Sequence, residues 1–254
     1  MNLYGCQLAA GFGRLTRLPL GRWLPSPDMV DEAASVWTYP VVGACIGALA
    51  GLVYALASDI GMTPALAACW TLIAGVLLTG GLHEDGLADT ADGLGGGATP
   101  SRKLAIMRDS RIGTYGALAL VFSLAVRGCA IMAIAHPGSV VVSLIVSGML
   151  GRTAMVVVLR RTMPARAEGQ AASLGTIGRI PARVGGAIAA FGTWVLMPFS
   201  TAFLLTVIAG LIGALWARFI RRAIGGYTGD TLGAVEVITE CVVLTMIAIR
   251  LFRA

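Results

Sequence analysis

The sequence predicts an all-α protein, a polytopic helix bundle embedded in a membrane. Of its 254 residues, 57% are hydrophobic and only 13% are charged, whereas soluble domains carry about 25% charged residues. The apolar residues gather in runs close to the length of a membrane helix, about 20 residues, and no alternating pattern typical of a membrane β-barrel is visible. We therefore expect a single integral membrane domain, residues 1–254, with about seven transmembrane helices.

An N-terminal segment precedes the first predicted span. Arginines and prolines interrupt its apolar residues, and no compact apolar core leads to a small-residue cleavage site, which argues against a cleavable signal peptide. Residues 1–22 mix apolar and basic side chains, as in an amphipathic helix at a membrane surface. We expect residues 1–35 to form an interfacial segment, followed by Trp37 and Tyr39 in an aromatic belt.

The apolar runs that follow predict the transmembrane spans. Five of them cover residues 40–57, 64–82, 115–135, 140–159 and 232–251. Two shorter runs, residues 185–196 and 201–217, predict two tilted spans, with one re-entrant hairpin as the alternative. The first span contains overlapping GxxxG pairs, which allow close helix packing and also a homo-oligomer, at Gly43, Gly47 and Gly51.

The basic residues predict the orientation. Arg127 and Arg152 each fall inside a predicted span, so each must face the bundle interior or a wet cavity. Most other basic residues occur in alternate loops, which the positive-inside rule assigns to the cytoplasm. This places the acidic motif 83–97 and the motif 225–240 together on the cytoplasmic face. The net charge of +6 comes with no nucleic-acid-binding motif, so we expect no nucleic-acid partner.

The acidic motif directly follows a predicted span. Asp85, Asp89 and Asp92 stand at positions i, i+4 and i+7, which places all three on one face of a helix. Three carboxylates at such spacing repel one another unless a cation lies between them. Hard oxygen ligands suit Mg²⁺ or Mn²⁺. A solvated acidic loop is the alternative, but it does not explain the one-face spacing.

The chemistry that fits these residues is phosphoryl transfer. A metal held by carboxylates bridges phosphate oxygens and neutralises their charge, and neighbouring arginines add bidentate contacts. The sequence contains no GxxxxGK[ST], GxSxG or HExxH motif, which argues against a P-loop ATPase, an α/β-hydrolase and a zinc protease. We therefore expect a phosphorylated substrate that approaches from the cytoplasm.

Several motifs together resemble one family. GGLHEDGLADTADGLGGG at 80–97 and RKLAIMRDSRIGTYGALAL at 102–120 are similar to the cobalamin synthases, the adenosylcobinamide-GDP ribazoletransferases. LTRLPL at 15–20, GRT at 151–153, ARAEG at 165–169 and GGYTGDTLGAVEVITE at 225–240 resemble further motifs of that family in the same order. One departure is Val237, where family members often carry an acidic or amide residue, and this weakens the case for Glu236.

The resemblance implies a reaction and a location. The 5′ hydroxyl of α-ribazole, or of α-ribazole 5′-phosphate, attacks the cobinamide-side phosphate of adenosylcobinamide-GDP. GMP leaves, and adenosylcobalamin or its 5′-phosphate forms. The family further implies a multi-pass protein of the bacterial cytoplasmic (inner) membrane, and the large corrinoid suits an open cavity facing the cytoplasm.

Residue roles follow from the spacing together with the resemblance. We expect Asp85, Asp89 and Asp92 to bind Mg²⁺, with Mn²⁺ as the other suitable ion, and Asp89 or Asp92 to act also as general base. Asp109 or Asp230 completes or supports the site, unless Asp109 only pairs with Arg108 or Arg111 and Asp230 only caps a helix. His83 is a metal ligand, a base or a capping residue. We expect Glu84 and Glu240 to support the site, and phosphate contacts from Arg108, Arg111, Arg152 and Arg166.

Two other classes of protein share some of these features. A secondary transporter also places carboxylates and arginines inside helices, but its acids lie near the membrane midplane within an inverted repeat, and no such repeat is visible. A non-catalytic membrane scaffold needs no carboxylate cluster. Turnover of adenosylcobinamide-GDP by purified protein separates the three classes.

Overall fold

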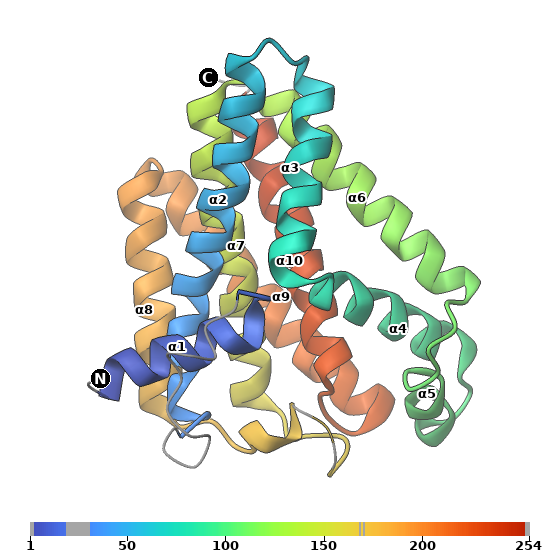
Figure 1. Ribbon diagram of the computed structural model, residues 1–254. Coiled ribbons are helices and arrows are strands. Elements are labelled where there is room, and N and C mark those ends of the chain that lie inside the picture. Colours follow the sequence, from blue (N-terminus) through green and yellow to red (C-terminus); the bar gives the residue numbers. More distant parts are fainter. Residues whose placement is uncertain (1–2, 19–30, 168, 170, 252–254) are drawn as a thin grey trace.

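The computed structural model describes residues 3–18, 31–167, 169 and 171–251. Within these residues the chain is almost wholly helical, with one isolated β-bridge between Pro164 and Tyr227 (Figure 1). The α-helices are α1 (Leu3–Leu15), α2 (Tyr39–Asp59), α3 (Pro64–Thr79), α4 (Leu82–Gly96), α5 (Pro100–Ile106), α6 (Thr114–Ile134), α7 (Pro137–Arg161), α8 (Arg179–Leu196), α9 (Phe199–Ile224) and α10 (Gly229–Leu251).

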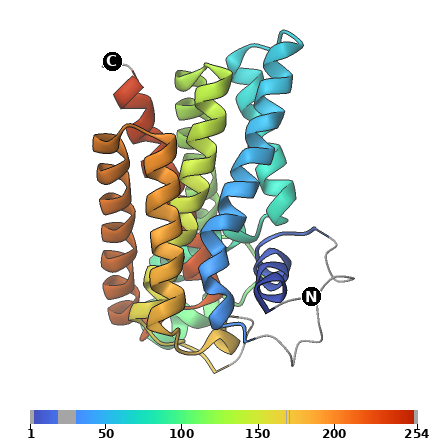
Figure 2. The ribbon, with the colours of Figure 1, turned by 90° about the vertical axis from the view of Figure 1, so that its left-hand side faces the viewer.

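The helices confirm a polytopic membrane bundle. Among the described residues, five helices are long and apolar enough to cross a membrane, namely α2 with the preceding 3₁₀ turn, α6, α7, α9 and α10. The bent pair of α3 and α4 makes a sixth if it is counted as one span. Helix α8 runs beside these helices (Figure 2), but Arg179 and Arg183 near its start lower its hydropathy. The two short runs form two separate helices, α8 and α9, of which α9 is long and apolar enough to cross. Whether α8 crosses as well stays a prediction, and the expected number of about seven spans is reached only if α3 and α8 both cross.

Helix α7 lies at the centre of the bundle and packs against α2, α8, α9 and α10. Its contact with α2 depends on the predicted glycines. A Cβ atom on Gly43 would lie 2.1 Å from the carbonyl oxygen of Gly148, and one on Gly47 would lie 2.1 Å from that of Leu144. The backbones therefore touch, as small residues permit in membranes. Because α7 already occupies this glycine face, the face gives no support to a homo-oligomer, which stays a prediction.

A sharp bend separates α3 from α4. Gly80 and Gly81 have φ angles of +67° and +71°, a left-handed conformation that is costly for residues with a Cβ atom. The two helices consequently meet at 89°, and α4 lies along one end of the bundle (Figure 1). The predicted span of residues 64–82 is therefore too long: the apolar helix ends at Thr79. The acidic motif lies on α4, beyond the end of the apolar helix α3.

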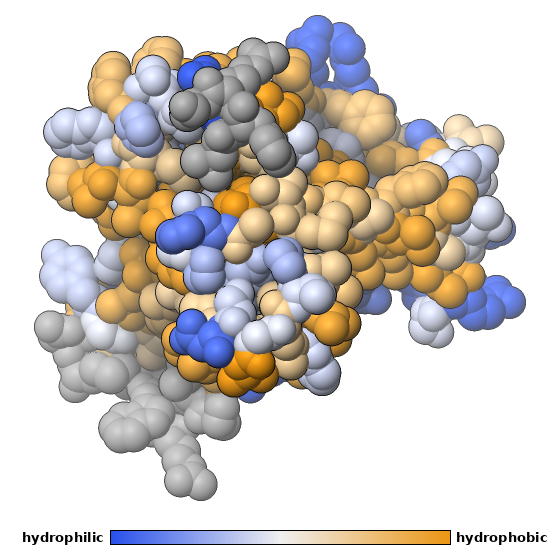
Figure 3. Space-filling model, turned by 90° about the horizontal axis from the view of Figure 1, so that it is seen from above, coloured by the Kyte–Doolittle hydropathy of each residue, from blue (hydrophilic) through white to orange (hydrophobic). Residues whose placement is uncertain are grey.

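The two ends of the bundle differ in charge. Helices α7 and α9 end, and α8 begins, at the same end as α4, and basic residues cluster there, namely Arg160, Arg161, Arg179, Arg183, Arg218, Arg221 and Arg222. The opposite end, which carries the α2–α3 connection, mixes hydrophobic and pale side chains with a few hydrophilic ones (Figure 3). Helix α1 lies across α2 at the basic end (Figure 1), as expected for an interfacial helix. Residues 19–30 of the predicted interfacial segment lie outside the described residues, and the side of the membrane that each end faces stays a prediction.

Candidate active site

The first turns of α4 and α10 pack directly against each other. A Cβ atom on Gly86 would lie 2.8 Å from the carbonyl oxygen of Asp230, and one on Gly233 would lie 3.1 Å from the Cα atom of His83. A methyl group at Gly86 would overlap the backbone of Asp230, and one at Gly233 would make an unusually tight contact with the backbone of His83. The contact brings the acidic face of α4 beside Asp230, although the two motifs lie more than a hundred residues apart in sequence.

Asp85 and Asp230 line one cavity of about 230 Å³ together with Arg166. Arg166 lies in the loop that follows α7, and its Nη2 donates a hydrogen bond of 2.7 Å to Asp230 Oδ2. This loop is held beside α10 by two backbone hydrogen bonds, from Ala165 N to Tyr227 O (2.8 Å) and from Tyr227 N to Met163 O (2.9 Å). The cavity thus combines carboxylates with a guanidinium group, as the sequence predicted for these three residues.

Threonines, and not Asp230, cap the N-terminus of α10. The Thr228 N–H donates to Thr231 Oγ1 (2.8 Å), and the Thr231 N–H donates to Thr228 Oγ1 (3.2 Å), which is the reciprocal pattern of a capping box. The Asp230 carboxylate is therefore not needed as a cap. It turns instead toward Arg166, and it also accepts a hydrogen bond of 3.1 Å from the Thr228 hydroxyl.

Asp89 lies one helical turn beyond Asp85 on α4. Partial burial and the negative charges of Asp85, Asp230 and Asp92 together raise the pKa of Asp89 to about 7, although Arg166 lowers it. The effect of these charges shows that the acidic groups converge without enough positive charge to balance them. A bound cation would relieve this repulsion.

Asp92 has a different surrounding from Asp85 and Asp89. Its two carboxylate oxygens accept hydrogen bonds from the backbone N–H groups of Gly113 (2.7 Å) and Gly116 (2.9 Å). These donors belong to the start of α6, where a negative charge is favourable. Asp92 is nearly buried and does not line the cavity of Asp85 and Asp230. It therefore joins α4 to α6.

Asp109 and Arg111 form an exposed ion pair in the loop before α6. Arg111 donates two side-chain hydrogen bonds to the Asp109 carboxylate, at 3.0 and 2.7 Å, and these bonds lower the pKa of Asp109 to about 2. Neither residue lines the acidic cavity, and neither does the exposed Arg108. The structure thus gives Asp109 the ion pair that was the alternative to a metal site, and it places the two arginines away from the cavity.

A second group of charges lies inside the bundle. Arg127 donates to Glu84 (2.9 Å) and to Glu240 (3.2 Å), while Arg152 pairs with Glu236 and with Glu240 (2.7 Å). Both arginines face the interior, as their positions inside spans required. Arg152, however, lies away from the acidic cavity, so its guanidinium group binds two glutamates where a phosphate contact was expected.

His83 belongs to this interior group and not to the acidic cavity. Its side chain is buried, and its Nε2 has no hydrogen-bond partner among the described residues. It lines a small cavity of about 50 Å³ together with Arg127, Arg152 and Glu240. His83 therefore lies with the charged residues that support α4 and α10.

Glu236 is the main residue that sequence reasoning discounted. It is almost fully buried and pairs with Arg152. The case for Glu236 was weakened because the neighbouring Val237 departs from the family pattern. The position of Glu236 inside an apolar run was nevertheless sufficient to predict an ion pair. Glu236 and Arg152 each place a charge inside an apolar run, and a charge inside a membrane helix needs a partner of opposite sign.

The cavity residues suit Mg²⁺ in one specific way. Among the described residues, no group of three or more His, Cys, Asp or Glu side chains is arranged to hold a metal by itself. Mg²⁺, however, is commonly bound through one or two carboxylates, with substrate phosphates and water completing its coordination. Asp85 and Asp230 share a cavity. Asp89 is not among the residues that line it, but it lies close enough for the charges of Asp85 and Asp230 to raise its pKa. The donor set therefore fits an ion that is bound together with a phosphorylated substrate.

Comparison with known proteins identifies the family. Residues 7–248 match the model of the family described as cobalamin-5-phosphate synthase. An adenosylcobinamide-GDP ribazoletransferase of Bradyrhizobium diazoefficiens is 43% identical over 95% of this chain and 92% of its own length. Ribazoletransferases of Mesorhizobium japonicum and Shewanella piezotolerans are each 36% identical, over 93% and 98% of this chain and 90% and 95% of their own lengths. No solved structure matches the chain. The chain belongs to the cobalamin-5-phosphate synthase family.

Proposed function

We propose that this protein is an adenosylcobinamide-GDP ribazoletransferase. It joins the 5′ oxygen of α-ribazole, or of α-ribazole 5′-phosphate, to the cobinamide-side phosphorus and releases GMP. Relatives with this printed name match at least 90% of both chains. The observation that carries the proposal is the shared cavity of Asp85, Asp230 and Arg166, because a pyrophosphate donor needs carboxylate-held metal and guanidinium groups together.

Arg166 binds and orients the donor phosphate in this proposal. Its guanidinium group is held by Asp230 through one nitrogen, which leaves other N–H groups for phosphate oxygens. The N-terminus of α10 begins at the same cavity, since Gly229 also lines it. A helix N-terminus favours negative charge. Arginine and helix end thus act on the same phosphate group.

Asp85 and Asp230 would hold Mg²⁺, with Asp89 beside them. When bound, Mg²⁺ neutralises the charge that develops on the phosphate oxygens and on the leaving GMP. Mn²⁺ is the other ion that this donor set suits.

Asp89 is the better candidate for the general base. Both oxygens of Asp92 accept backbone hydrogen bonds from the start of α6, so its carboxylate is oriented toward α6. Asp89 is on the same face as Asp85 and belongs to the uncompensated group of charges. We assign to Asp89 the removal of the proton from the attacking 5′ hydroxyl, and to Asp92 the positioning of α4 against α6.

The cavity accepts only part of the donor. Its volume of about 230 Å³ is below the range of about 300–1,000 Å³ for sites that enclose a drug-sized ligand. The phosphates enter the cavity, and the corrinoid stays outside it. The cavity lies at the arginine-rich end of the bundle, and by the positive-inside rule this supports an active site that faces the cytoplasm.

The reaction is tested with purified full-length protein in detergent. The protein is mixed with adenosylcobinamide-GDP, α-ribazole and Mg²⁺, and the products are separated by chromatography. We expect GMP and adenosylcobalamin in equal amounts, loss of both on chelation by EDTA, and recovery when Mg²⁺ is added back. Folded, monodisperse protein that releases no GMP under these conditions contradicts the proposal.

A further inference from the structure

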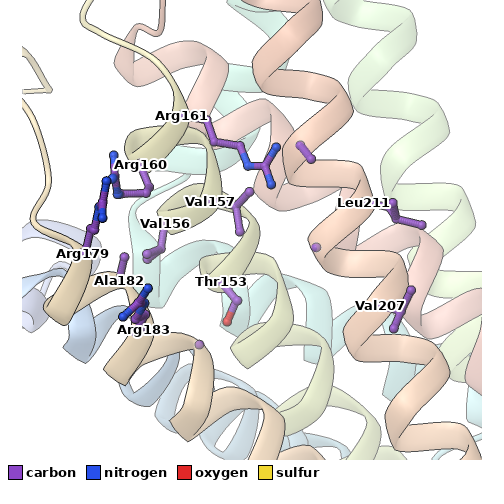
Figure 4. Close-up of a pocket in the computed structure, with 13 residues that line it drawn as sticks. Thr153, Val156, Val157, Arg160, Arg161, Arg179, Ala182, Arg183, Val207 and Leu211 are labelled. Atoms are coloured by element: carbon purple, nitrogen blue, oxygen red, sulfur yellow. The ribbon is translucent and has the colours of Figure 1, made fainter.

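A groove lies between α7, α8 and α9 and shares no lining residue with the acidic cavity. Its volume is about 700 Å³. Figure 4 places Arg160, Arg179 and Arg183 along one side of the groove, and Val207 and Leu211 of α9 across from them. The groove is therefore basic at one end and on one side, and apolar along α9.

The arginines of the groove lack a compensating charge. In the part of the chain that the structure describes, no carboxylate lies within 4.0 Å of the guanidinium groups of Arg160, Arg161, Arg179 or Arg183. This differs from the interior of the bundle, where Arg127 and Arg152 each bind two glutamates. Four neighbouring guanidinium groups without a carboxylate are suited to an anion, and their planar donor geometry matches phosphate oxygens.

The apolar part of the groove is kept open by glycines. A Cβ atom on Gly186 of α8 or on Gly210 of α9 would meet no heavy atom within 4 Å. On α7 the lining runs from Thr153 to Arg161, about 12 Å along the helix axis. The groove thus extends from the arginines toward the hydrocarbon region, with room for part of an acyl chain.

The flank that contains the groove is apolar. Helices α8 and α9 expose large apolar side chains beside it, among them Phe191, Trp194, Phe203 and Leu215. We propose that the groove binds a phospholipid with an anionic headgroup. The arginines contact the headgroup phosphate, and one acyl chain lies along the apolar part between α8 and α9. A phosphate joined to an apolar chain matches both halves of the groove, whereas a soluble phosphate uses only the arginines.

The proposal is tested by native mass spectrometry of the purified full-length protein with added phosphatidylglycerol or phosphatidylcholine. Wild-type protein should retain phosphatidylglycerol in preference to phosphatidylcholine. The double variant Arg161→Gln/Arg183→Gln should bind phosphatidylglycerol about thirtyfold more weakly, with phosphatidylcholine binding unchanged. The matched control is Arg221→Gln/Arg222→Gln. It removes two exposed arginines from the last turn of α9, at the same end of the bundle as the groove arginines, and neither of them lines the groove. It should bind both lipids as the wild type does.

A second pair of variants tests the acyl-chain part. Gly186→Leu places a side chain in the open space of the groove and should also lower phosphatidylglycerol binding, while all arginines remain. Ala187→Leu is its control, because Ala187 is exposed on the same helix and does not line the groove. Unchanged phosphatidylglycerol binding in both Arg161→Gln/Arg183→Gln and Gly186→Leu overturns the proposal. Displacement of the lipid by millimolar glycerol 3-phosphate overturns it too, because the site then binds a free phosphate.

Discussion

Arg166 donates a hydrogen bond of 2.7 Å to Asp230 and so connects the loop after α7 to the first turn of α10. This contact orients the guanidinium group at the mouth of the cavity that Asp85 shares. It explains how residues from three distant parts of the sequence come to one site. The ion pair is partly exposed, so its main effect is on the position of Arg166 and not on the stability of the bundle.

Arg166→Gln should lower kcat/KM for adenosylcobinamide-GDP by about 10- to 100-fold, because a charged hydrogen bond to phosphate is lost. Steady-state GMP release measures this. Arg218→Gln, an exposed arginine at the same end of the bundle, is the control and should be close to wild type. Equal kcat/KM values in the two variants would remove Arg166 from the phosphate site.

Asp92→Ala should lower stability. It removes the acceptor for two backbone N–H groups at the start of α6, and loss of such an acceptor costs about 1–2 kcal/mol. Thermal unfolding in detergent should show a lower Tm than that of the wild type. Asp92→Asn retains one acceptor oxygen, so its Tm should lie between those of the wild type and Asp92→Ala. An unchanged Tm in Asp92→Ala would show that the α4–α6 contact is not held by this carboxylate.

Arg152→Met should destabilise the bundle strongly, by about 3–5 kcal/mol, because Glu236 is left as an unpaired buried charge. The double variant Arg152→Met/Glu236→Gln removes that unpaired charge and should recover part of the loss. Chemical denaturation of the single and double variants measures the difference. If the double variant is as unstable as the single variant, the pairing of these two residues is not the cause.

Gly47→Ala should weaken the contact between α2 and α7. The added methyl group would lie 2.1 Å from Leu144 O, and overpacking of this kind costs about 1–3 kcal/mol. Gly210→Ala is the control, since a methyl group there meets no neighbouring atom. The Tm of Gly47→Ala should fall and that of Gly210→Ala should not; equal values would show that the backbones can separate without cost.

The sequence predicted the spans well because a membrane helix carries its own signal. The apolar runs at residues 115–135 and 140–159, for example, correspond closely to α6 and α7. The end of α3 was missed because the apolar run continues to Leu82, while the bend depends on the conformation of Gly80 and Gly81. A short glycine pair does not show by itself whether a helix bends.

The candidate site was only partly predictable for a different reason. The spacing of Asp85 and Asp89 placed them on one face of α4, and the family motif pointed to Asp230 and Arg166. The partner of Asp92 was not predictable, because Gly113 and Gly116 reach it only through the packing of α6 on α4. The same holds for Arg152, whose pairing with Glu236 requires the arrangement of α7 and α10.

In the proposed function, the acidic face of α4 carries out phosphoryl transfer, and Asp89 is its base. The most direct measurement is single-turnover GMP release by Asp89→Asn in saturating Mg²⁺, beside Asp59→Asn, which changes an exposed carboxylate at the opposite end of the bundle. We predict that Asp89→Asn remains folded, with a Tm near that of the wild type, and releases GMP at least about 100-fold more slowly. Asp59→Asn should match the wild type. Near-normal GMP release by Asp89→Asn would contradict the account.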